Sequence, residues 1–596
     1  MQTYNAPLRD MRFVLHELHG YDRLNAYPKF ADATPDLVDS VLEEAAKLAT
    51  EVILPTNMVG DQEGCVLENG VVRTPTGYKA AYDTFRDGGW PSLAFEPEWG
   101  GQGLPESVSK MVEEMLSAAN VAFGLYPGLT QGAIRALQSH ASQELKQTYM
   151  PKMVEGVWSG AMCLTEAHCG TDLGLLRTKA MPNGDGSYRL DGSKIFISAG
   201  EHDLTENIIH LVLAKLPDAP AGTRGISLFV VPKFIPTEDG RPGPRNGVVC
   251  TGIEHKMGLK GSATCQLTFE DARGWLVGEP NKGMAAMFTM MNAERLGVGI
   301  QGLGINEAAY QAGVAYAKDR LQGRSLSGAK RPDLPADPII VHPDVRRMLM
   351  TMRVYAEGCR AVGGWVAQAM DVAEASEDPV EKLAAEDFVA IMTPVVKALF
   401  TDMGSEAANL AVQVYGGHGY IREHGVEQYV RDARIAQLYE GTNGIQAMDL
   451  VGRKLGAHMG RYLRGVFHPI AEFIAANKDD AAVGKLVNKL EQAFGALQLT
   501  TGDLVQRSMK DPEEAGAAAV DYLRMLGLVA MGYMFVKSAK IAADKAPTAN
   551  GDAGFYEAKQ ASARFFVDRV LPQATGLFLT LKSGKAAMMA MPQEAF

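Results

Sequence analysis

The chain has 596 residues, 46% hydrophobic and 21% charged, and a formal net charge of −12 at pH 7. A single hydrophobic core stops growing well below this length, so we expect three or four domains in an ordinary soluble globular protein. The acidic balance argues against general binding to nucleic acid or to an anionic membrane. We see no secretory signal at the amino terminus and no apolar run near the ~20 residues of a membrane span.

The six cysteines are scattered along the chain without a CxxC pair. This usage predicts neither a metal site nor a disulfide framework and is typical of the reducing cytoplasm. No GxSxG, metal-spaced histidine cluster or Walker-type GxxxxGK[ST] is present, so hydrolase and P-loop functions have no support. The sequence indicates a soluble cytoplasmic enzyme.

The hydrophobic pattern changes from helical to strand-like and back along the chain. The fold class is therefore mainly α with an inserted β domain. The predicted domains are an N-terminal helical domain (1–155), a β domain (156–283), a helical bundle (284–460) and a C-terminal helical extension (461–596).

Strand signals are concentrated in the predicted β domain. Asp191-Gly192 separates two strand-like runs, a pattern that predicts a hairpin with its turn at this pair. Residues 207–216 and 225–233 are further β-rich runs bounded by turn residues. We therefore expect a small all-β domain between helical regions.

Gly297, Gly299 and Gly302 match the GxGxxG fingerprint of dinucleotide-binding folds. That motif needs a preceding strand and a tight turn, whereas these glycines lie inside a helical pattern. Close packing between helices is the better interpretation, and a nicotinamide-binding Rossmann domain is disfavoured. The extension contains 16 Lys plus Arg and 14 Asp plus Glu, so it is not a basic nucleic-acid module.

Four segments follow one another in a fixed order: MCLTEAHCGTDLGLLRTKA (162–180), GSKIFISAG (192–200), EHKMGLKGSATCQLTFEDARGWLVGEPNKGM (254–284) and the stretch 413–446 that ends in YEGTNGIQ. Together they resemble the acyl-CoA dehydrogenase family, flavoenzymes that oxidise an acyl-CoA to its 2-enoyl form. The resemblance covers about residues 30–460. It implies a helical domain, a β-barrel-like middle domain and a helical bundle, in agreement with the order inferred from the hydrophobic pattern.

Within the family, the total length, the segment YNAPLRDMRFVLHELHGYDRL and the C-terminal extension are most similar to the 3-methylmercaptopropionyl-CoA dehydrogenases of dimethylsulfoniopropionate degradation. This resemblance implies conversion of 3-methylmercaptopropionyl-CoA to 3-methylthioacryloyl-CoA. A medium- or long-chain fatty acyl-CoA dehydrogenase stays open as an alternative. An acyl-CoA oxidase and a nucleic-acid-binding relative are further alternatives, and the acidic charge disfavours the second.

Oxidation of a thioester at Cα and Cβ needs a base at Cα, a hydride acceptor at Cβ and hydrogen-bond donors on the carbonyl oxygen, where enolate charge develops. No side chain can accept a hydride, so a redox cofactor is required. The family implies FAD, with flavin N5 as the acceptor.

Glu440 matches the catalytic base of the family in the YEGT motif. Some members carry the base instead at the position of Glu294, and those members lack it in YEGT. This chain has both carboxylates, so we assign catalysis to Glu440 and a pocket role to Glu294, which remains the rival. The remaining predicted substrate-binding residues are Thr171, Asn292, Arg295, Tyr439 and Gly441.

The resemblance also assigns residues to FAD. Those expected at the flavin and pyrophosphate are Met162, Thr165, Thr171, Phe196 and Ser198, and those expected at the ADP half or beside it are Arg320, Gln322, Gln413, Gly416, Gly417, Thr442 and Asn443. The usual TEPGAGSD reads TEAHCGTD here, which places His168 and Cys169 in the turn without a catalytic role.

Members of the family bind the ADP half across a subunit interface. The resemblance therefore implies a homo-oligomer, either a dimer or a dimer of dimers. It also implies electron-transfer flavoprotein as the electron acceptor of a dehydrogenase, whereas an oxidase would use O₂.

Overall fold

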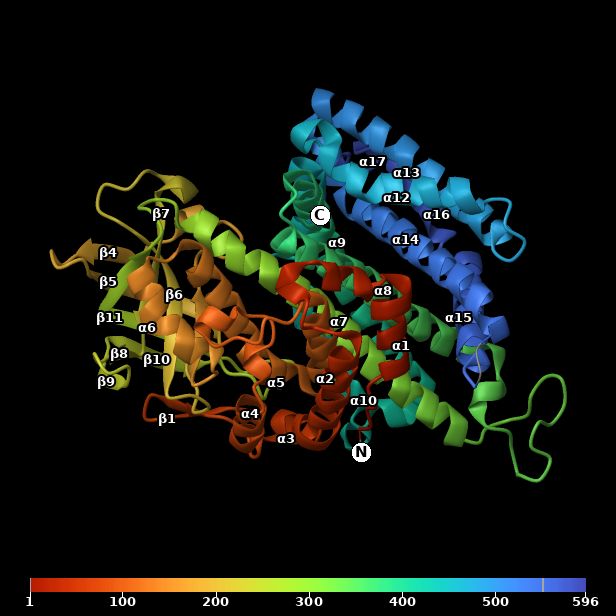
Figure 1. Ribbon diagram of the computed structural model, residues 1–596, viewed down its shortest axis with the longest axis horizontal. Coiled ribbons are helices and arrows are strands. Elements are labelled where there is room, and N and C mark those ends of the chain that lie inside the picture. Colours follow the sequence, from red (N-terminus) through yellow and green to blue (C-terminus); the bar gives the residue numbers. More distant parts are fainter. Residues whose placement is uncertain (1, 549–550) are drawn as a thin grey trace. The chain divides into compact units, whose positions relative to one another are not determined.

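The computed structural model describes residues 2–548 and 551–596 (Figure 1). The chain divides into two compact units. The bundle unit comprises Met1–Glu43, Pro105–Glu114 and Val298–Phe596, and the barrel unit comprises Glu44–Leu104 and Met115–Gly297. Helices and strands follow the predicted α–β–α order, which confirms the fold class. The four domain boundaries that we expected stay a prediction.

Long helices dominate the bundle unit. α8 and α9 pack along each other, and only residues 376–378 connect them. The helices with residues in this unit are α1 (Leu8–Arg12), α2 (Pro35–Lys47), α5 (Glu106–His140), α7 (Gly283–Asp319), α8 (Pro343–Ala375), α9 (Pro379–Tyr415), α10 (Val426–Ala436), α11 (Asn443–Asp449), α12 (Arg461–Asn477), α13 (Gly484–Lys510), α14 (Pro512–Lys545), α15 (Ala553–Phe565), α16 (Gln573–Lys582) and α17 (Ala586–Met589).

The GxGxxG glycines lie inside α7, where they let this helix approach α9 closely. A Cβ at Gly299 would come within 2.7 Å of the Val396 side chain, and one at Gly302 within 2.6 Å of the Phe400 carbonyl oxygen. On α9, a Cβ at Gly404 would lie 2.4 Å from the Gly302 carbonyl oxygen. The backbones of α7 and α9 are in contact at these glycines, because a side chain there would keep them apart. The interpretation as helix packing is therefore confirmed.

The C-terminal extension packs on the bundle through α14. A Cβ at Gly527 of α14 would lie 2.5 Å from the Leu399 side chain on α9, which again shows close backbone approach. Residues 512–548 are long and apolar enough to cross a membrane by length and composition, but 83% of their most apolar window is buried inside the protein. Burial as a core helix accounts for this composition.

A buried charge cluster joins distant parts of the bundle unit. The Arg360 guanidinium on α8 contacts Glu114 (Nη2–Oε1 2.5 Å), Glu307 (2.7 Å) and Asp10. Lys559 of α15 pairs with Asp10 as well. We call these five residues the Arg360 cluster. It ties the N-terminal segment, α5, α7, α8 and the extension together.

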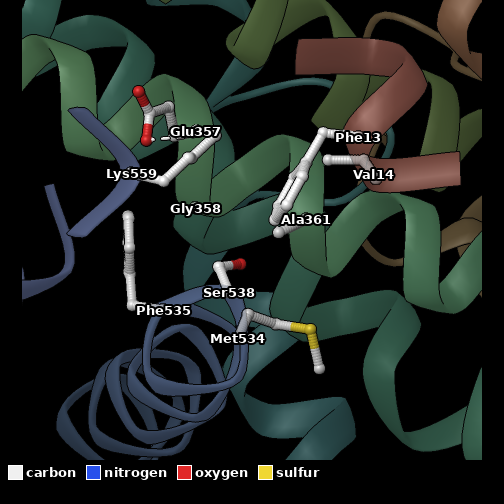
Figure 2. A pocket seen from close by; sticks show the side chains of 9 residues that line it. All are labelled: Phe13, Val14, Glu357, Gly358, Ala361, Met534, Phe535, Ser538 and Lys559. Carbon is white, nitrogen blue, oxygen red and sulfur yellow. Dashed lines mark ion pairs between the residues drawn. The ribbon is translucent and has the colours of Figure 1, made fainter. Parts of the chain in front are cut away.

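A small pocket borders this cluster (Figure 2). Lys559 reaches Glu357 there at 3.2 Å, and the ring of Phe13 faces the pocket from the N-terminal segment. The other lining residues are Val14, Gly358, Ala361, Met534, Phe535 and Ser538. Because most of the lining is apolar, the pocket is a packing gap beside the ion pairs.

The barrel unit is built around a seven-stranded sheet. Its strands pair in the order β10-β11-β5-β4-β6-β3, and β7 pairs with both β11 and β6. Strands β11, β5, β4, β6 and β7 therefore form a closed ring, which confirms the barrel-like middle domain. The strands are β3 (Trp158–Cys163), β4 (Lys179–Pro182), β5 (Tyr188–Ser198), β6 (Asn207–Lys215), β7 (Ile226–Pro232), β10 (Val248–Ile253) and β11 (Thr264–Val277).

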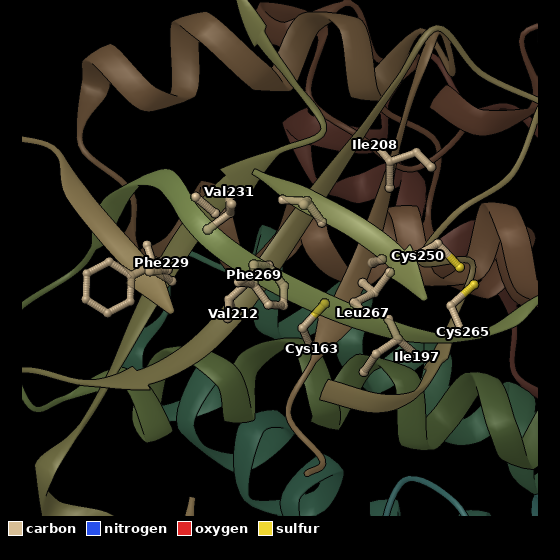
Figure 3. Packing of buried hydrophobic residues seen from close by; sticks show 14 of the residues in the cluster. Cys163, Ile197, Ile208, Val212, Phe229, Val231, Cys250, Cys265, Leu267 and Phe269 are labelled. Carbon is tan, nitrogen blue, oxygen red and sulfur yellow. The ribbon is translucent and has the colours of Figure 1, made fainter. Parts of the chain in front are cut away.

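The interior of the sheet is filled by aliphatic, aromatic and cysteine side chains (Figure 3). Phe229 and Phe269 are buried there together with the thiols of Cys163 and Cys265. All six cysteines of the chain are free. Cys163, Cys250 and Cys265 serve as small core residues of this interior.

Smaller elements complete the barrel unit. Two short two-stranded sheets, β1–β2 and β8–β9, were not predicted. Their bounds and those of the remaining helices are α3 (Pro55–Glu63), α4 (Tyr78–Asp87), α6 (Gln143–Val154), β1 (Val66–Glu68), β2 (Val71–Arg73), β8 (Phe234–Pro236) and β9 (Pro242–Arg245).

The predicted hairpin turn at Asp191-Gly192 is wrong. Both residues lie within the continuous strand β5, and the hairpin of β4 with β5 turns at residues 183–187. Gly192 is needed for another reason, because a Cβ there would lie 2.5 Å from the Thr178 hydroxyl. The Asp-Gly signal at 185–186 is the pair that forms the turn. The predicted strands at 207–216 and 225–233 are confirmed as β6 and β7.

Candidate active site

Glu440 lies in the short connection between α10 and α11, which we call the base loop (437–443). Its φ is +55° and that of Gly441 is +84°. A left-handed conformation costs a non-glycine residue roughly 1–2 kcal/mol. Such strain persists only where the surroundings enforce it, and it is concentrated at functional sites. The side chain of Glu440 is half-buried.

The residues beside Glu440 fix the start of α11 and the loop itself. Thr442 is the N-cap of α11 and accepts the Ile445 backbone N–H at 3.3 Å. Asn443 turns its amide inward and donates to Asp402 (2.7 Å) on α9. Tyr439 donates its hydroxyl to Gln301 of α7. These contacts give Thr442 and Asn443 structural roles, and their contact with FAD stays a prediction.

The flavin segments lie close together in the barrel unit. Met162 is near the end of β3, and the Thr165 carbonyl accepts the Ile195 N–H of β5 at 3.0 Å. This bond brings the 162–171 segment beside Phe196 and Ser198. Phe196 has a φ of +58° and is 59% exposed, which is unusual for a phenylalanine in a strand. The exposed ring offers a flat apolar face at this edge of β5.

The altered turn TEAHCGTD forms a tight two-residue reversal. Glu166 and Cys169 exchange backbone hydrogen bonds of 2.9 and 3.0 Å, which brings their side chains and His168 together. Ligand atoms of these three residues lie within 4.8 Å of one another, a set that the sequence did not indicate. Glu166 is already held by Lys194 (2.9 Å) and Thr178 (2.6 Å). Burial opposes ionisation of Glu166, but these partners lower its pKa to about 2, so it serves as the ionised anchor of the turn.

The rival carboxylate, Glu294, lies on the part of α7 that belongs to the barrel unit. It is buried, and its Oε1 would lie 2.3 Å from a Cβ on Gly132 of α5. Arg295 beside it is also buried, donates to Asn292 (3.2 Å) and lies 5.8 Å from the Phe288 ring centroid. A side chain at position 132 would therefore force the Glu294 carboxylate to move.

The residues predicted at the ADP half lie in two exposed places of the bundle unit. Arg320 and Gln322 are exposed just after α7. Gln413 is exposed near the end of α9, which Gly416 and Gly417 follow in a 3₁₀ turn. A Cβ on either glycine would meet no atom within 4 Å among the described residues. The backbone at Gly416-Gly417 is therefore open to close approach by another group.

Sequence reasoning missed what holds the segment after Arg320. Asp337 is buried there and accepts the backbone N–H groups of Ser325 (2.9 Å), Lys330 (2.9 Å) and Arg331 (2.7 Å). The bond from the Ser325 N–H is the main cause that lowers the pKa of Asp337 to about 2. Burial opposes this shift, and the bonds from Arg331 and Lys330 add to it. In the sequence Asp337 stands among the arginines and prolines of a loop. This pattern does not indicate that its carboxylate accepts several backbone N–H groups.

Aromatic stacking at the Gly416-Gly417 turn was also missed. The rings of Tyr316 and Tyr415 stack at 4.1 Å, and those of His418 and His424 at 4.7 Å. The Tyr316 hydroxyl and His418 Nδ1 lie 2.9 Å apart. These contacts fix the turn that follows α9. The contacts of Tyr316 with Tyr415 and His418 connect residues about 100 positions apart, so local pattern could not indicate them.

The structure thus gathers the predicted residues in two sets. The barrel unit carries Met162, Thr165, Thr171, Phe196 and Ser198 together with Asn292, Glu294 and Arg295. The bundle unit carries Glu440 and its neighbours in one loop, and Arg320, Gln322, Gln413, Gly416 and Gly417 at the ends of α7 and α9. Their roles toward substrate and cofactor stay predictions.

Comparison with known proteins decides the family. Four domain models match in chain order: acyl-CoA dehydrogenase N-terminal (residues 40–157), middle (161–272) and C-terminal (281–455) domains, and an acetyl-CoA dehydrogenase C-terminal-like domain (466–592). A 3-methylmercaptopropionyl-CoA dehydrogenase of Ruegeria pomeroyi is 43% identical over 96% of this chain and 97% of its own length. The chain belongs to the acyl-CoA dehydrogenase family.

Other members of the acyl-CoA dehydrogenase family are similar over nearly the whole chain. A butyryl-CoA dehydrogenase of Syntrophomonas wolfei is 36% identical over 100% of this chain and 99% of its own. The crystal structure of an acyl-CoA dehydrogenase complexed with FAD from Bacillus anthracis has a TM-score of 0.74 at 20% identity and covers 95% of this chain and 90% of that one. The similarity to the Bacillus anthracis structure shows the fold of this chain.

Family membership establishes the class of chemistry. This acyl-CoA dehydrogenase is an oxidoreductase, and FAD is the cofactor of the family. The residues present fit such a group. Phe196 presents an exposed ring, Arg320 an exposed guanidinium that suits a pyrophosphate, and Gly416 and Gly417 leave their backbone open.

Proposed function

We propose that this enzyme oxidises 3-methylmercaptopropionyl-CoA to 3-methylthioacryloyl-CoA in the cytoplasm. The observation that carries the proposal is the 43% identity to the Ruegeria pomeroyi enzyme, which extends over 96% of the chain. The extension α12–α17 is included in this likeness, so it involves more than the common catalytic domains. The alternative is a fatty acyl-CoA, which the 36% identity to a butyryl-CoA dehydrogenase favours.

In the proposed reaction Glu440 removes the α-proton of the thioester. Glu440 is half-buried in a loop whose backbone is fixed on both sides, so the base is held in place. Bound FAD supplies the acceptor for the hydride that leaves Cβ. Tyr439 would pack beside the acyl chain, and Gly441 would allow close approach of the substrate. Asn292 and Arg295 would lie toward CoA, and Glu294 would have a role in the pocket.

The same proposal assigns residues to the cofactor. Met162, Thr165, Thr171, Phe196 and Ser198 hold the flavin and pyrophosphate in the barrel unit. Arg320, Gln322, Gln413, Gly416 and Gly417 would hold an ADP half, and Thr442 and Asn443 are further proposed contacts of the cofactor. In the family that site is shared between subunits, so we propose a homo-oligomer, either a dimer or a dimer of dimers.

Electron-transfer flavoprotein is the proposed acceptor of the electrons. An oxidase would instead pass them to O₂. The two are separated by reoxidation of the substrate-reduced enzyme, which we expect to be slow in air-saturated buffer and fast with electron-transfer flavoprotein. Rapid reoxidation in air during turnover would identify an oxidase.

A substrate panel tests the proposed specificity. The purified yellow enzyme is mixed anaerobically with 3-methylmercaptopropionyl-CoA, butyryl-CoA or octanoyl-CoA, and the loss of flavin absorbance is followed. We expect the methylmercapto substrate to have the highest ratio of maximal reduction rate to Kd. A higher ratio for butyryl-CoA or octanoyl-CoA would replace the proposed substrate by a fatty acyl-CoA, and no bleaching with any of them would contradict dehydrogenation itself.

A further inference from the structure

The base loop is fastened to α9 by a buried lysine. The Nζ of Lys397 donates to the Gly441 carbonyl at 2.9 Å and to the Asn443 Oδ1 at 2.8 Å. The side chain of Lys397 is completely buried. An ammonium group is strongly hydrated, and its removal from water is costly unless its hydrogens find acceptors. Here two of those acceptors belong to the loop that carries Glu440.

A second buried donor acts on the adjacent peptide group. Gln446, on the first turns of α11, donates its Nε2 to the Glu440 carbonyl at 3.0 Å and is also completely buried. The carbonyls of Glu440 and Gly441 are therefore both held by donors from inside the bundle. These carbonyls belong to the two peptide planes that follow the Glu440 Cα, so their bonds fix the backbone directly after the base.

The ends of the base loop are fastened to α9 as well. Gln437 donates to the Asp402 Oδ1 at 2.6 Å, and Asn443 donates to the same oxygen at 2.7 Å. The Asn443 N–H also reaches the Gln437 carbonyl at 3.1 Å, which closes the loop. Lys397 and Asp402 are five positions apart on one helix. α9 thus offers a cation to the middle of the loop and an anion to its ends.

These contacts explain how a glutamate persists in a left-handed conformation. Without Lys397 the Gly441 carbonyl would lose a charge-assisted bond, and without Gln446 the Glu440 carbonyl would lose its buried donor. Either loss lets the loop relax to backbone angles that a glutamate adopts more readily. The carboxylate would then move relative to the position that the loop now gives it.

We propose that Lys397, together with Gln446, is a positioning residue for the catalytic base. The pair holds Glu440 in the single backbone conformation from which it takes the α-proton. The inference rests on the proposed role of Glu440. It differs from that role because Lys397 touches the loop and acts on the reaction only through it.

The experiment measures anaerobic flavin reduction by stopped flow in Lys397→Met and Gln446→Leu. Lys382→Met, an exposed lysine on the same helix, is the matched control. The substrate is whichever acyl-CoA reduces the wild-type enzyme best. A base displaced by about 1 Å loses roughly 100-fold in rate, so we expect the maximal reduction rate to fall about 10- to 100-fold in both variants. FAD content and the Kd for acyl-CoA should remain within twofold of the control.

The pH profile of reduction separates positioning from direct acid–base chemistry. If Lys397 only positions the base, the plateau rate falls in Lys397→Met while a base-dependent rise with pH persists. Loss of the pH dependence itself would make Lys397 a reacting group and overturn the inference. Reduction at the control rate in Lys397→Met would overturn it as well.

Two further outcomes keep the test decisive. If Lys397→Met does not fold, Gln446→Leu decides alone, and a control-like rate in that variant overturns the inference. Failure of the proposed function is distinguishable, because it would appear as flavin reduction at the wild-type rate in Glu440→Gln. Loss of rate in Glu440→Gln with control-like rates in Lys397→Met and Gln446→Leu would reject the positioning role only.

Discussion

Two buried cations on neighbouring helices of the bundle unit are used in different ways. Arg360 on α8 is surrounded by the carboxylates of Asp10, Glu114 and Glu307. Lys397 on α9 contacts a backbone carbonyl and a side-chain amide. The first cation neutralises charge between segments that are hundreds of residues apart. The second holds the conformation of one short loop.

The difference separates stability from positioning. An arginine can donate five hydrogen bonds in a fixed plane, so it suits a site where several acids must be satisfied at once. A lysine ends in a compact group whose donors point in three directions, which suits converging loop atoms. We therefore expect loss of Arg360 to lower the free energy of unfolding and loss of Lys397 to lower the rate of flavin reduction.

Removal of the arginine should have the largest effect on stability. Arg360→Met leaves three acids buried without their shared partner, and breaking a buried ion pair costs about 3–5 kcal/mol. Urea denaturation would measure this loss, with Arg347→Met, an exposed arginine on the same helix, as control. A loss below about 1 kcal/mol would show that the cluster contributes little.

Gly302→Ala should have an intermediate effect, and it should change both the free energy of unfolding and the rate of flavin reduction. The added methyl would lie 2.6 Å from the Phe400 carbonyl on α9, close to Thr401, which contacts Asn443. Overpacking of this kind costs about 1–3 kcal/mol, and the displaced α9 should also slow flavin reduction. Gly495→Ala on α13 is the control, because its methyl meets no described atom within 4 Å. Unchanged stability in Gly302→Ala would mean that α7 and α9 separate without cost.

The smallest effect concerns the pH dependence of the Arg360 cluster. Burial raises the pKa of Glu114 to about 7, against the attraction of Arg360. A raised pKa means that the folded state binds the proton more tightly, so this contribution to stability is present below the ordinary pKa of glutamate. It is lost as pH rises through about 7.

Glu114→Gln should remove that slope. The amide cannot ionise, so the decline in unfolding free energy between pH 5 and pH 8, at most about 1.4 kcal/mol per pH unit from this group, should be smaller than in the wild type. Urea denaturation at both pH values measures it. An identical decline in the variant would assign the pH dependence to other groups.

The hydrophobic pattern predicted much of the fold because each helix and strand shows its period within a short stretch of neighbouring residues. The strand runs that became β6 and β7 are continuous apolar segments, and the GxGxxG glycines lie in an unbroken helical pattern. The hairpin at Asp191-Gly192 failed because two Asp-Gly pairs stand close together, and register with β4 selects the first of them. The spacing of residues in the sequence does not indicate which of the two pairs forms the turn.

The site could be predicted only where a motif marks it. YEGT indicated Glu440, but nothing near it in the sequence indicates Lys397, which is 43 positions away and resembles any helical lysine. The Arg360 cluster could not be predicted from the sequence for the same reason, since its members range from Asp10 to Lys559. The role of a charged residue depends on whether it is buried, and burial is determined by tertiary packing.

The central claim is that Glu440 is the catalytic base, and its most direct test is the rate of anaerobic flavin reduction in Glu440→Gln. Glu294→Gln is the matched comparison, because it removes the rival carboxylate by the same change. We expect the rate to fall by about 10²–10⁴-fold in Glu440→Gln, the usual contribution of a general base, and by far less in Glu294→Gln. A near wild-type rate in Glu440→Gln together with a large loss in Glu294→Gln would contradict the claim and transfer the role to Glu294.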